Sequence, residues 1–450
     1  MSAYKGHIYN LKEKTTVVAT EDILSDRGIL IAQSGAELNK KTYENLMKFK
    51  LLKPLEDSIA ISNQLNAKLI YDRIIQLVRM DPWLRSINDK LGNKAILQRS
   101  CLNVEKYSLL MQKLTVLSME MPDVFDQAVL SAYLCHICGI VDDMSQQETN
   151  EYFLAGLSHD IGFLHIDQKI LQKQETLTGE EWRTIQSHTV IGYEILKRID
   201  KFPKRVSRAV LEHHENLDGT GYPRAKTAHD LSPLGQVVNL VDNVIAIYNK
   251  RFKPVNRSLR DIIPIIQVNM HSYFPDAVSA ILRLLKEAHK SPAQDTEALV
   301  TASLIEYVQK EQSYIQSVID LIQQHNDFIG FTHNEKQVYA IQNIAINIIM
   351  ITNSSGLSDS NYTAWLEDIK DGTPENLYNE VEDTRVMLGE VIYQLQNYQK
   401  AANLFVSKNP THPLKNKVKA IVDSFGNINR SPAPQVLKQY WDKLAQKKVV

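Results

Sequence analysis

Paired histidines and a histidine-aspartate pair are the residues of this chain most suited to chemistry. His213 and His214 stand inside LEHHENLDGTGYP (211–223), in front of a glycine-rich turn, and His159 is followed by Asp160 after an apolar run. Mixed imidazole and carboxylate ligands suit manganese, iron, zinc or nickel better than calcium or magnesium, and they leave coordination positions open for water. These residue types therefore indicate a metal centre.

Two further residues extend this set. His188 lies in the amphipathic segment EEWRTIQSHTVIGYEIL, and Asp242 lies in the apolar run QVVNLVDNVIAIY, where an ionisable side chain needs a partner or an ion. Each has a simpler interpretation, because a lone histidine-aspartate pair is more often a surface hydrogen bond and Asp242 could pair with a lysine. Four histidines and two carboxylates on successive helices are nevertheless what a helical bundle needs for one metal centre.

Helices must position these residues. From about 63 to 150 the apolar residues recur at helical spacing, and few glycines or prolines interrupt them. The segment 151–290 is also mainly helical and contains six of the 13 histidines between His159 and His229. After KSPAQDT (290–296), which has the composition of a linker, long amphipathic helices resume.

The N-terminal segment has a different pattern. Residues 14–33 carry β-branched runs on either side of Asp26-Arg27-Gly28, which predicts a short hairpin, and 51–61 predicts another extended piece. The fold class expected is therefore mainly α, a helical bundle with a small β-containing N-terminal region and an additional C-terminal helical region. The predicted regions are 1–62 (small and β-containing), 63–119 (a helical connector), 120–290 (the metal-binding domain) and 295–450 (a helical domain of unknown role).

Composition excludes several classes of partner and location. Lys and Arg number 51 and Asp and Glu 52, so no global positive field exists to hold duplex nucleic acid, although a local site can still bind a small anion. The N-terminus has no apolar signal core, and no apolar run is expected to approach the length of a membrane span. We expect a soluble, cytoplasmic protein. Cys135-His136-Ile137-Cys138 lies in an apolar helical run and is interpreted as buried thiols rather than a zinc or redox site.

Together, the candidate residues follow a known pattern. In chain order they are His159-Asp160-Ile161-Gly162, His188, His213-His214-Glu215, Asp218-Gly219-Thr220-Gly221-Tyr222-Pro223, Asp242 and Arg251. Over about 120–290 this pattern resembles the HD-GYP domain, a bacterial subgroup of the HD superfamily. The resemblance implies an all-helical, HD-type domain with a two- or three-metal site, commonly of iron or manganese, that hydrolyses the signalling nucleotide cyclic di-GMP to pGpG and sometimes to GMP.

The resemblance also implies roles for individual residues. His188, His213 and His214 would bind one ion, Asp160 would bridge to a second ion, and His159 and Asp242 would hold that second ion. Catalysis would centre on Asp160 and His159. The substrate would be contacted by Gly221, Tyr222 and Arg251.

Three positions depart from the family's pattern. The family usually carries a glutamate and a histidine four residues apart on the preceding helix, and its usual spacing from His159 places Asp123 and Gln127 there. Asp123 could still bind a metal through a shorter side chain, whereas the amide of Gln127 is a poor ligand, so one or two ions are expected rather than three. Phe163 stands where the family normally has a lysine that contacts the substrate phosphate, and the loss of that charge should weaken binding and transition-state stabilisation.

Two hypotheses follow. The intact set of six ligands favours an enzyme, a metal-dependent cyclic di-GMP phosphodiesterase. Gln127 and Phe163 favour the alternative, a catalytically weak or inactive module that binds cyclic di-GMP or contacts protein partners through the Gly-Tyr-Pro loop and the C-terminal helices. The sequence leaves a homodimer open.

Overall fold

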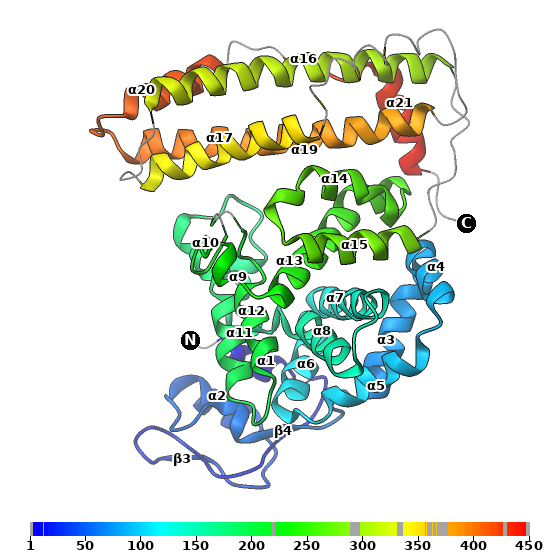
Figure 1. Cartoon of the computed structure of the whole chain (residues 1–450). Coiled ribbons are helices and arrows are strands. Elements are labelled where there is room, and N and C mark those ends of the chain that lie inside the picture. Colours follow the sequence, from blue (N-terminus) through cyan, green and yellow to red (C-terminus); the bar gives the residue numbers. More distant parts are fainter. Residues whose placement is uncertain are drawn as a thin grey trace. The chain divides into compact units, whose positions relative to one another are not determined.

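The computed structural model describes residues 3–11, 13–217, 219, 221–288, 298–330, 336–355, 357, 362, 366, 377–425 and 430–446. They form two compact units, an N-terminal unit of Met1–Ala246 with Tyr273–Ala288 and a C-terminal unit of Ile247–Ser272 with His289–Val450. Helices dominate both units, which confirms the predicted mainly α fold class (Figure 1). The two units do not match the four predicted regions one to one, so that finer division stays a prediction.

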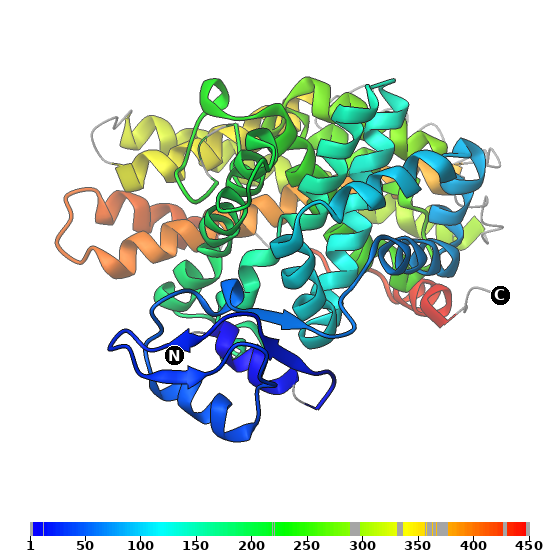
Figure 2. The same ribbon diagram turned by 90° about the horizontal axis from the view of Figure 1, so that it is seen from below.

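Short strands and helices make up the N-terminal region that ends at β4. They are α1 (Ala3–Leu11), β1 (Val17–Ala19), β2 (Ile23–Leu24), β3 (Leu30–Ala32), α2 (Lys40–Lys48), the 3-10 turn η1 (Leu55–Asp57) and β4 (Ile59–Ile61). β2 and β3 pair antiparallel on either side of the Asp26-Arg27-Gly28 turn, so the predicted hairpin is present. β1 does not join it but pairs antiparallel with β4 in the N-terminal region (Figure 2). The paired residues Val17 and Ile61 are both buried.

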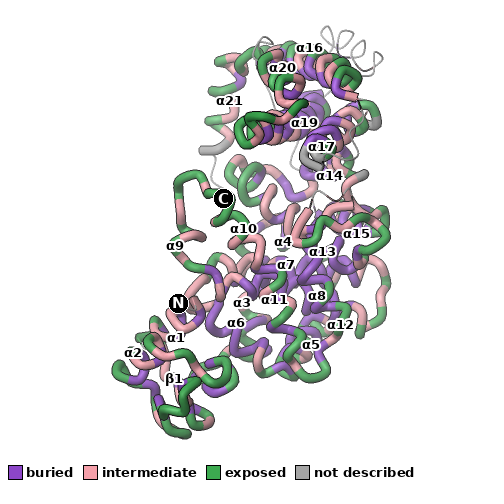
Figure 3. Tube along the Cα trace, turned by 90° about the vertical axis from the view of Figure 1, so that its left-hand side faces the viewer, coloured by how far each residue is buried: buried purple, intermediate pink, exposed green. Residues whose placement is uncertain are grey.

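The rest of the N-terminal unit is helical. Its main helices are α3 (Ala67–Met80), α4 (Pro82–Leu91), α5 (Lys94–Val104), α6 (Ser108–Glu120), α7 (Pro122–Val141), α8 (Gln146–Ser158), α9 (Gln168–Leu171), α10 (Gly179–Gln186), α11 (His188–Lys197), α12 (Lys204–Glu212), α13 (Pro233–Ile247) and α15 (Pro275–Glu287). α7 and α8 pack closely and are largely buried (Figure 3). The approach depends on Gly156, because a Cβ there would lie 2.6 Å from the carbonyl oxygen of Ser131.

α7 corrects one sequence-based expectation. Contrary to the prediction that no apolar run would reach the length of a membrane span, this 20-residue helix is long and apolar enough to cross a bilayer. Two-thirds of its most apolar window is buried inside the unit, where it packs against α8 and α6. It lies in the core of this unit, and its side chains are apolar because they pack against the neighbouring helices.

The C-terminal unit consists of long helices around an apolar core. They are α14 (Ile263–Val268), α16 (Ala298–Ile329), α17 (Lys336–Ser354), α19 (Leu377–Lys408), α20 (Lys415–Phe425) and α21 (Gln435–Gln446), preceded by the turns η4 (Tyr248–Phe252), η5 (Lys253–Val255) and η6 (Leu259–Ile262). α16 and α19 pack along each other and bury residues such as Leu304 and Val391. The predicted amphipathic helices are present, whereas the predicted linker at 290–296 lies outside the described residues.

Candidate metal centre

His159 and Asp160 lie in the turn that follows α8. This helix begins with a capping box between Ser145 and Glu148 and ends at Ser158, and a 3-10 turn, η2 (Ile161–His165), follows Asp160. Both side chains are buried, His159 completely. A histidine and a carboxylate are thus held together inside the helical core, where neither can be left without a partner at low cost.

Gly162 brings this turn against the start of α11. A Cβ at Gly162 would lie only 2.0 Å from the carbonyl oxygen of His188, so a larger residue cannot occupy the position without moving the backbone. Gly192, one turn further along α11, also faces this turn, since a Cβ there would lie 3.7 Å from the amide nitrogen of Gly162. As a result His188, the first residue of α11, lies beside Asp160.

Three histidines are oriented by the same local device. Nδ1 of His159, His188 and His213 lies 2.8, 2.7 and 2.7 Å, respectively, from the backbone carbonyl oxygen three residues earlier in the chain. A carbonyl oxygen only accepts hydrogen bonds, so each Nδ1 carries the proton and donates it. Each Nε2 is therefore the nitrogen directed away from the helix, which is how metal-binding histidines are commonly held.

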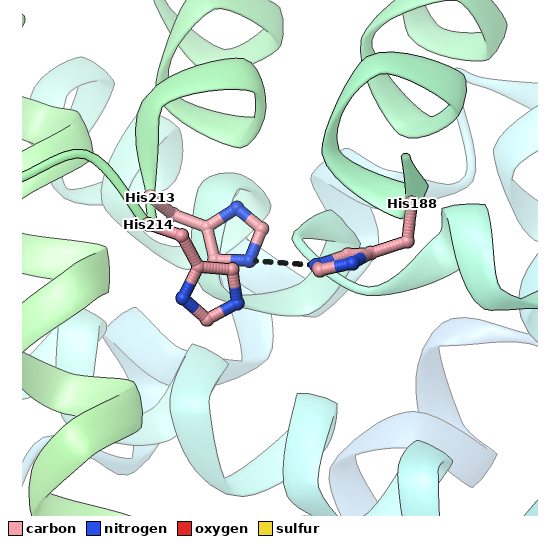
Figure 4. A group of neighbouring side chains, drawn as sticks. All are labelled: His188, His213 and His214. Carbon is pink, nitrogen blue, oxygen red and sulfur yellow. Dashed lines mark hydrogen bonds between the residues drawn. The ribbon is translucent and has the colours of Figure 1, made fainter. Parts of the chain in front are cut away.

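The free nitrogens converge on Asp160. Nε2 of His188 lies 3.3 Å from Nε2 of His213, and His214 completes a group whose ligand atoms all lie within 4.8 Å of one another (Figure 4). Oδ1 of Asp160 lies 3.4 Å from Nε2 of His188 and 3.8 Å from that of His213. Its Oδ2 lies 3.0 Å from Nε2 of His159. Oδ1 thus faces His188 and His213 whereas Oδ2 faces His159, an arrangement that suits a bridging ligand.

Asp242 on α13 faces the same cluster. Its Oδ1 lies 3.7 Å from Nε2 of His159 and accepts a 2.6 Å hydrogen bond from Nε2 of Gln127 on α7. Gln127 therefore lies at the candidate metal centre. Asp123, one turn earlier on α7, is exposed and belongs to neither of the ligand groups found among the described residues, so the geometry does not favour its predicted ligand role.

The pKa values of the four histidines are shifted in ways that favour the binding of a cation. Burial lowers the pKa of His188, lowers that of His213 well below its ordinary value and lowers that of His214 to about 4, so their lone pairs stay free at neutral pH. For His159, burial opposes protonation, but the Asp160 and Asp242 carboxylates together raise its pKa well above the ordinary value. The carboxylates therefore attract positive charge to this point of the core.

This donor set fits a divalent metal. Nε2 of His159 is buried and makes no hydrogen bond to the described residues, although carboxylate oxygens of Asp160 and Asp242 lie 3.0 and 3.7 Å from it. A cation between nitrogen and carboxylates would satisfy all three groups. The six side chains brought together are the six predicted ligands His159, Asp160, His188, His213, His214 and Asp242, and their individual roles as ligands are proposals taken up below.

The loop after His214 is closed by a residue to which the sequence assigned no role. The carboxylate of Glu215 accepts hydrogen bonds of 2.7 and 2.9 Å from the backbone amides of Arg224 and Lys226. Gly221 allows the loop to fold back, since a Cβ there would lie 2.3 Å from the carbonyl oxygen of His214. Asp218 and Thr220 lie outside the described residues. The position of Glu215 directly after the paired histidines is the sequence feature that could have indicated this role.

Aromatic rings pack against the histidines. Phe163 stacks on His188, with ring centroids 4.2 Å apart, and Tyr222 stacks on His214 at 4.7 Å. Trp182 on α10, 47% exposed, lies edge-on to Tyr222 at 6.2 Å and was not singled out from the sequence. Phe163 therefore supports a candidate ligand instead of supplying a charge.

Other predicted or discounted residues have contacts of their own. Arg251 belongs to the C-terminal unit, where its guanidinium donates a 3.0 Å hydrogen bond to Glu390 on α19. His136 on α7 lies next to Ser100, with 3.3 Å between Nδ1 and Oγ. Cys135 and Cys138 are buried free thiols, and burial raises the pKa of both, so a zinc or redox role finds no support.

The order of histidines and aspartates along these helices is matched by a known family of domains. Residues 112–278 match the model of the HD domain family, so this part of the chain is similar to HD domains.

The relatives it resembles are cyclic dinucleotide phosphodiesterases. The chain is 34% identical over 149 residues to a cyclic di-GMP phosphodiesterase of Thermotoga maritima, covering 32% of this chain and 40% of that protein. It is 33% identical over 141 residues to the cyclic di-GMP phosphodiesterase PdeB of Borreliella burgdorferi, covering 31% and 37%. A 3'3'-cGAMP-specific phosphodiesterase of Vibrio cholerae is 32% identical over 132 residues, covering 29% and 28%. The chain thus spans at most two-fifths of the length of these three relatives.

A substitution at Gln127 tests whether this position limits metal binding. We expect Gln127→His to replace an amide that only caps Asp242 with an imidazole that can bind a metal, and to raise the metal content by about one ion per chain. Elemental analysis of the purified proteins measures this content. Gln174→His, which adds a histidine at an exposed position, is the control and should leave the metal content unchanged. Equal content in wild type and Gln127→His would mean that the centre is complete without this residue.

Proposed function

We propose that this chain is a metal-dependent phosphodiesterase that hydrolyses cyclic di-GMP to pGpG or GMP in bacterial second-messenger signalling. The observation that carries the proposal is the convergence of four histidines and two aspartates on one buried point, with Asp160 between two sets of imidazoles. The names of the relatives over the same domain support the substrate class. We further propose one or two ions. Mixed nitrogen and carboxylate donors suit manganese, iron, zinc or nickel, and the resemblance to the HD-GYP domain favours iron or manganese among them.

The positions of the six side chains suggest which residues would bind each ion. His188, His213 and His214 would hold one ion, and His159 with Asp242 would hold the other, with Asp160 shared between them. When bound, the ions would supply a nucleophile at neutral pH and positive charge opposite the phosphate.

The residues proposed to contact substrate belong to two elements. The Gly221-Tyr222 loop would border the substrate, since Tyr222 stacks on the candidate ligand His214. Arg251 remains a proposed phosphate contact. The substrate phosphate would then have to compete with Glu390 for the Arg251 guanidinium.

A binding module is the second candidate, and two observations favour it. Gln127 occupies Asp242 with a hydrogen bond instead of offering a metal ligand, and Phe163 places an apolar ring where a phosphate-binding cation would assist catalysis. Such a module would keep the fold and bind cyclic di-GMP or protein partners with little or no turnover.

Turnover measured with defined metals separates the two candidates. Purified chain loaded anaerobically with Fe(II), or with Mn(II), is incubated with cyclic di-GMP and separately with 3'3'-cGAMP, and products are resolved by chromatography. The enzyme hypothesis predicts linear product from cyclic di-GMP that disappears after chelation of the metal. Tight binding of cyclic di-GMP without product in any metal would establish the binding module, and product from 3'3'-cGAMP alone would correct the substrate.

Phe163 provides a directed test of phosphate recognition. We expect Phe163→Lys to increase the affinity for cyclic di-GMP by about 10-fold, because an ammonium group replaces apolar surface beside the phosphate. Phe163→Leu is the matched control, since it also removes the stacking ring from His188 but adds no charge. Isothermal titration of the metal-loaded proteins gives both affinities. Equal affinities of Phe163→Lys and Phe163→Leu would show that this position does not face the phosphate.

A further inference from the structure

A fully buried lysine lies at the far end of the turn that begins at Asp160. The side chain of Lys113 on α6 is 0% exposed, and its Nζ lies 3.1 Å from Nε2 of His165, the last residue of η2. The same Nζ lies 3.4 Å from Oε1 of Glu56 and 3.3 Å from the centroid of the Tyr4 ring. A lysine enclosed in this way is rare and is tolerated only with such partners.

Two elements of the N-terminal region hold this lysine and its histidine. Tyr4 on α1 stacks on His165 with ring centroids 5.1 Å apart and an interplanar angle of 7°. Glu56 on η1 pairs with Lys113 and also accepts a 3.2 Å hydrogen bond from Arg198, the residue that caps α11. The N-terminal region therefore contacts both η2, which follows Asp160, and α11, which begins at His188.

The turn between His165 and Asp160 has little room to adjust. The amide of Phe163 donates a 3.0 Å hydrogen bond to the carbonyl oxygen of Asp160, and the amide of Ile166 donates one of equal length to that of Phe163. Gly162 lies in backbone contact with His188. A rotation or shift at His165 is thus transmitted to Asp160 within one short 3-10 turn.

We propose that Lys113 and His165 form a positioning pair that fixes Asp160, and that α1 and η1 of the N-terminal region are part of the support of the metal centre. The inference rests on the proposed function in one respect, that Asp160 is a metal ligand. The ammonium of Lys113 donates to the bare Nε2 of His165, and the Tyr4 ring and the Glu56 carboxylate hold the ammonium in place. These contacts orient a ligand without touching the metal, as outer partners of metal-binding residues commonly do.

The test must separate positioning from stability. Lys113→Met alone leaves Glu56 buried with one cation fewer and can unfold the protein, so the informative variant is Lys113→Met combined with Glu56→Gln, which removes both charges of the pair. Lys68→Met, at an exposed lysine on α3, is the matched control. Thermal melting identifies which variants are folded.

Two measurements are then made on folded protein. Mn(II) affinity is obtained by chelator competition, and hydrogen-deuterium exchange of residues 160–166 is followed in the metal-free protein. We expect the double variant to bind Mn(II) about 10-fold to 100-fold more weakly than wild type, with faster exchange at 160–166, while Lys68→Met matches wild type in both.

The outcomes decide the proposal in each case. If both the Mn(II) affinity and the exchange of 160–166 were unchanged in the double variant, the positioning role would be wrong. Lys113 and Glu56 would then form an ion pair that only stabilises the fold. If wild type itself binds no Mn(II), the proposed metal-dependent function fails, whereas the exchange of 160–166 still shows whether Lys113 and His165 hold the turn.

Discussion

Replacing Asp160 with alanine is expected to empty the metal centre. One of its oxygens faces His188 and His213 and the other faces His159, so Asp160→Ala removes a donor shared by both sides of the cluster. We expect metal content to fall below about one-tenth of the wild-type value and hydrolysis of cyclic di-GMP to fall by about 10³-fold or more. Elemental analysis and turnover under saturating Mn(II) measure the two effects.

The control for this variant is a second aspartate far from any cluster. Asp200→Ala removes an almost fully exposed carboxylate and should change neither metal content nor turnover. Melting curves establish that Asp160→Ala remains folded. Wild-type metal content in a folded Asp160→Ala protein would contradict the bridging role. The metal would then have to be bound by the histidines without Asp160.

Gly162→Ala is expected to have the second large effect, through the backbone. The added Cβ would lie 2.0 Å from the carbonyl oxygen of His188, so η2 and α11 must move apart. We expect a loss of about 3 kcal/mol in the free energy of unfolding and a decrease of about 10 °C in Tm. Metal affinity should fall as well, because the same displacement separates Asp160 from His188.

Gly179→Ala serves as the comparison, since nothing lies within 4 Å of a Cβ at that position. It should leave both Tm and metal affinity close to wild type. If Gly162→Ala melted like Gly179→Ala, the two elements would have to be able to separate freely, and the account of why His188 lies beside Asp160 would be wrong.

The six candidate ligands could be selected from the sequence because their residue types are uncommon inside apolar helical runs. Asp242 is an example, a carboxylate within a run of valines and leucines that ends in the core beside His159. Gln127 was located differently, from the usual spacing of the family that the chain resembles and not from its residue type. Periodicity and residue type are local properties, and local properties were sufficient for these positions.

The features that were missed depend on contacts between distant segments. Lys113 stands in a helix where a lysine is ordinarily solvated, and its burial depends on Tyr4 and Glu56, which belong to the N-terminal region, far from α6 in the sequence. The pairing of β1 with β4, which skips the β2–β3 hairpin and α2, is of the same kind. Arg251 was selected by its place in a motif, whereas its partner Glu390 lies on α19, well beyond that motif. No window of sequence contains these pairings.

The hydrogen bonds from Nδ1 to the carbonyl three residues earlier carry a thermodynamic consequence. His159, His188 and His213 each lose rotational freedom to their own stretch of backbone during folding, before any ion arrives. Conformational entropy that folding has already removed is not removed again on ligation. An ion bound here would therefore meet imidazoles that are already oriented, and its affinity should depend mainly on how well the separate segments pack against one another.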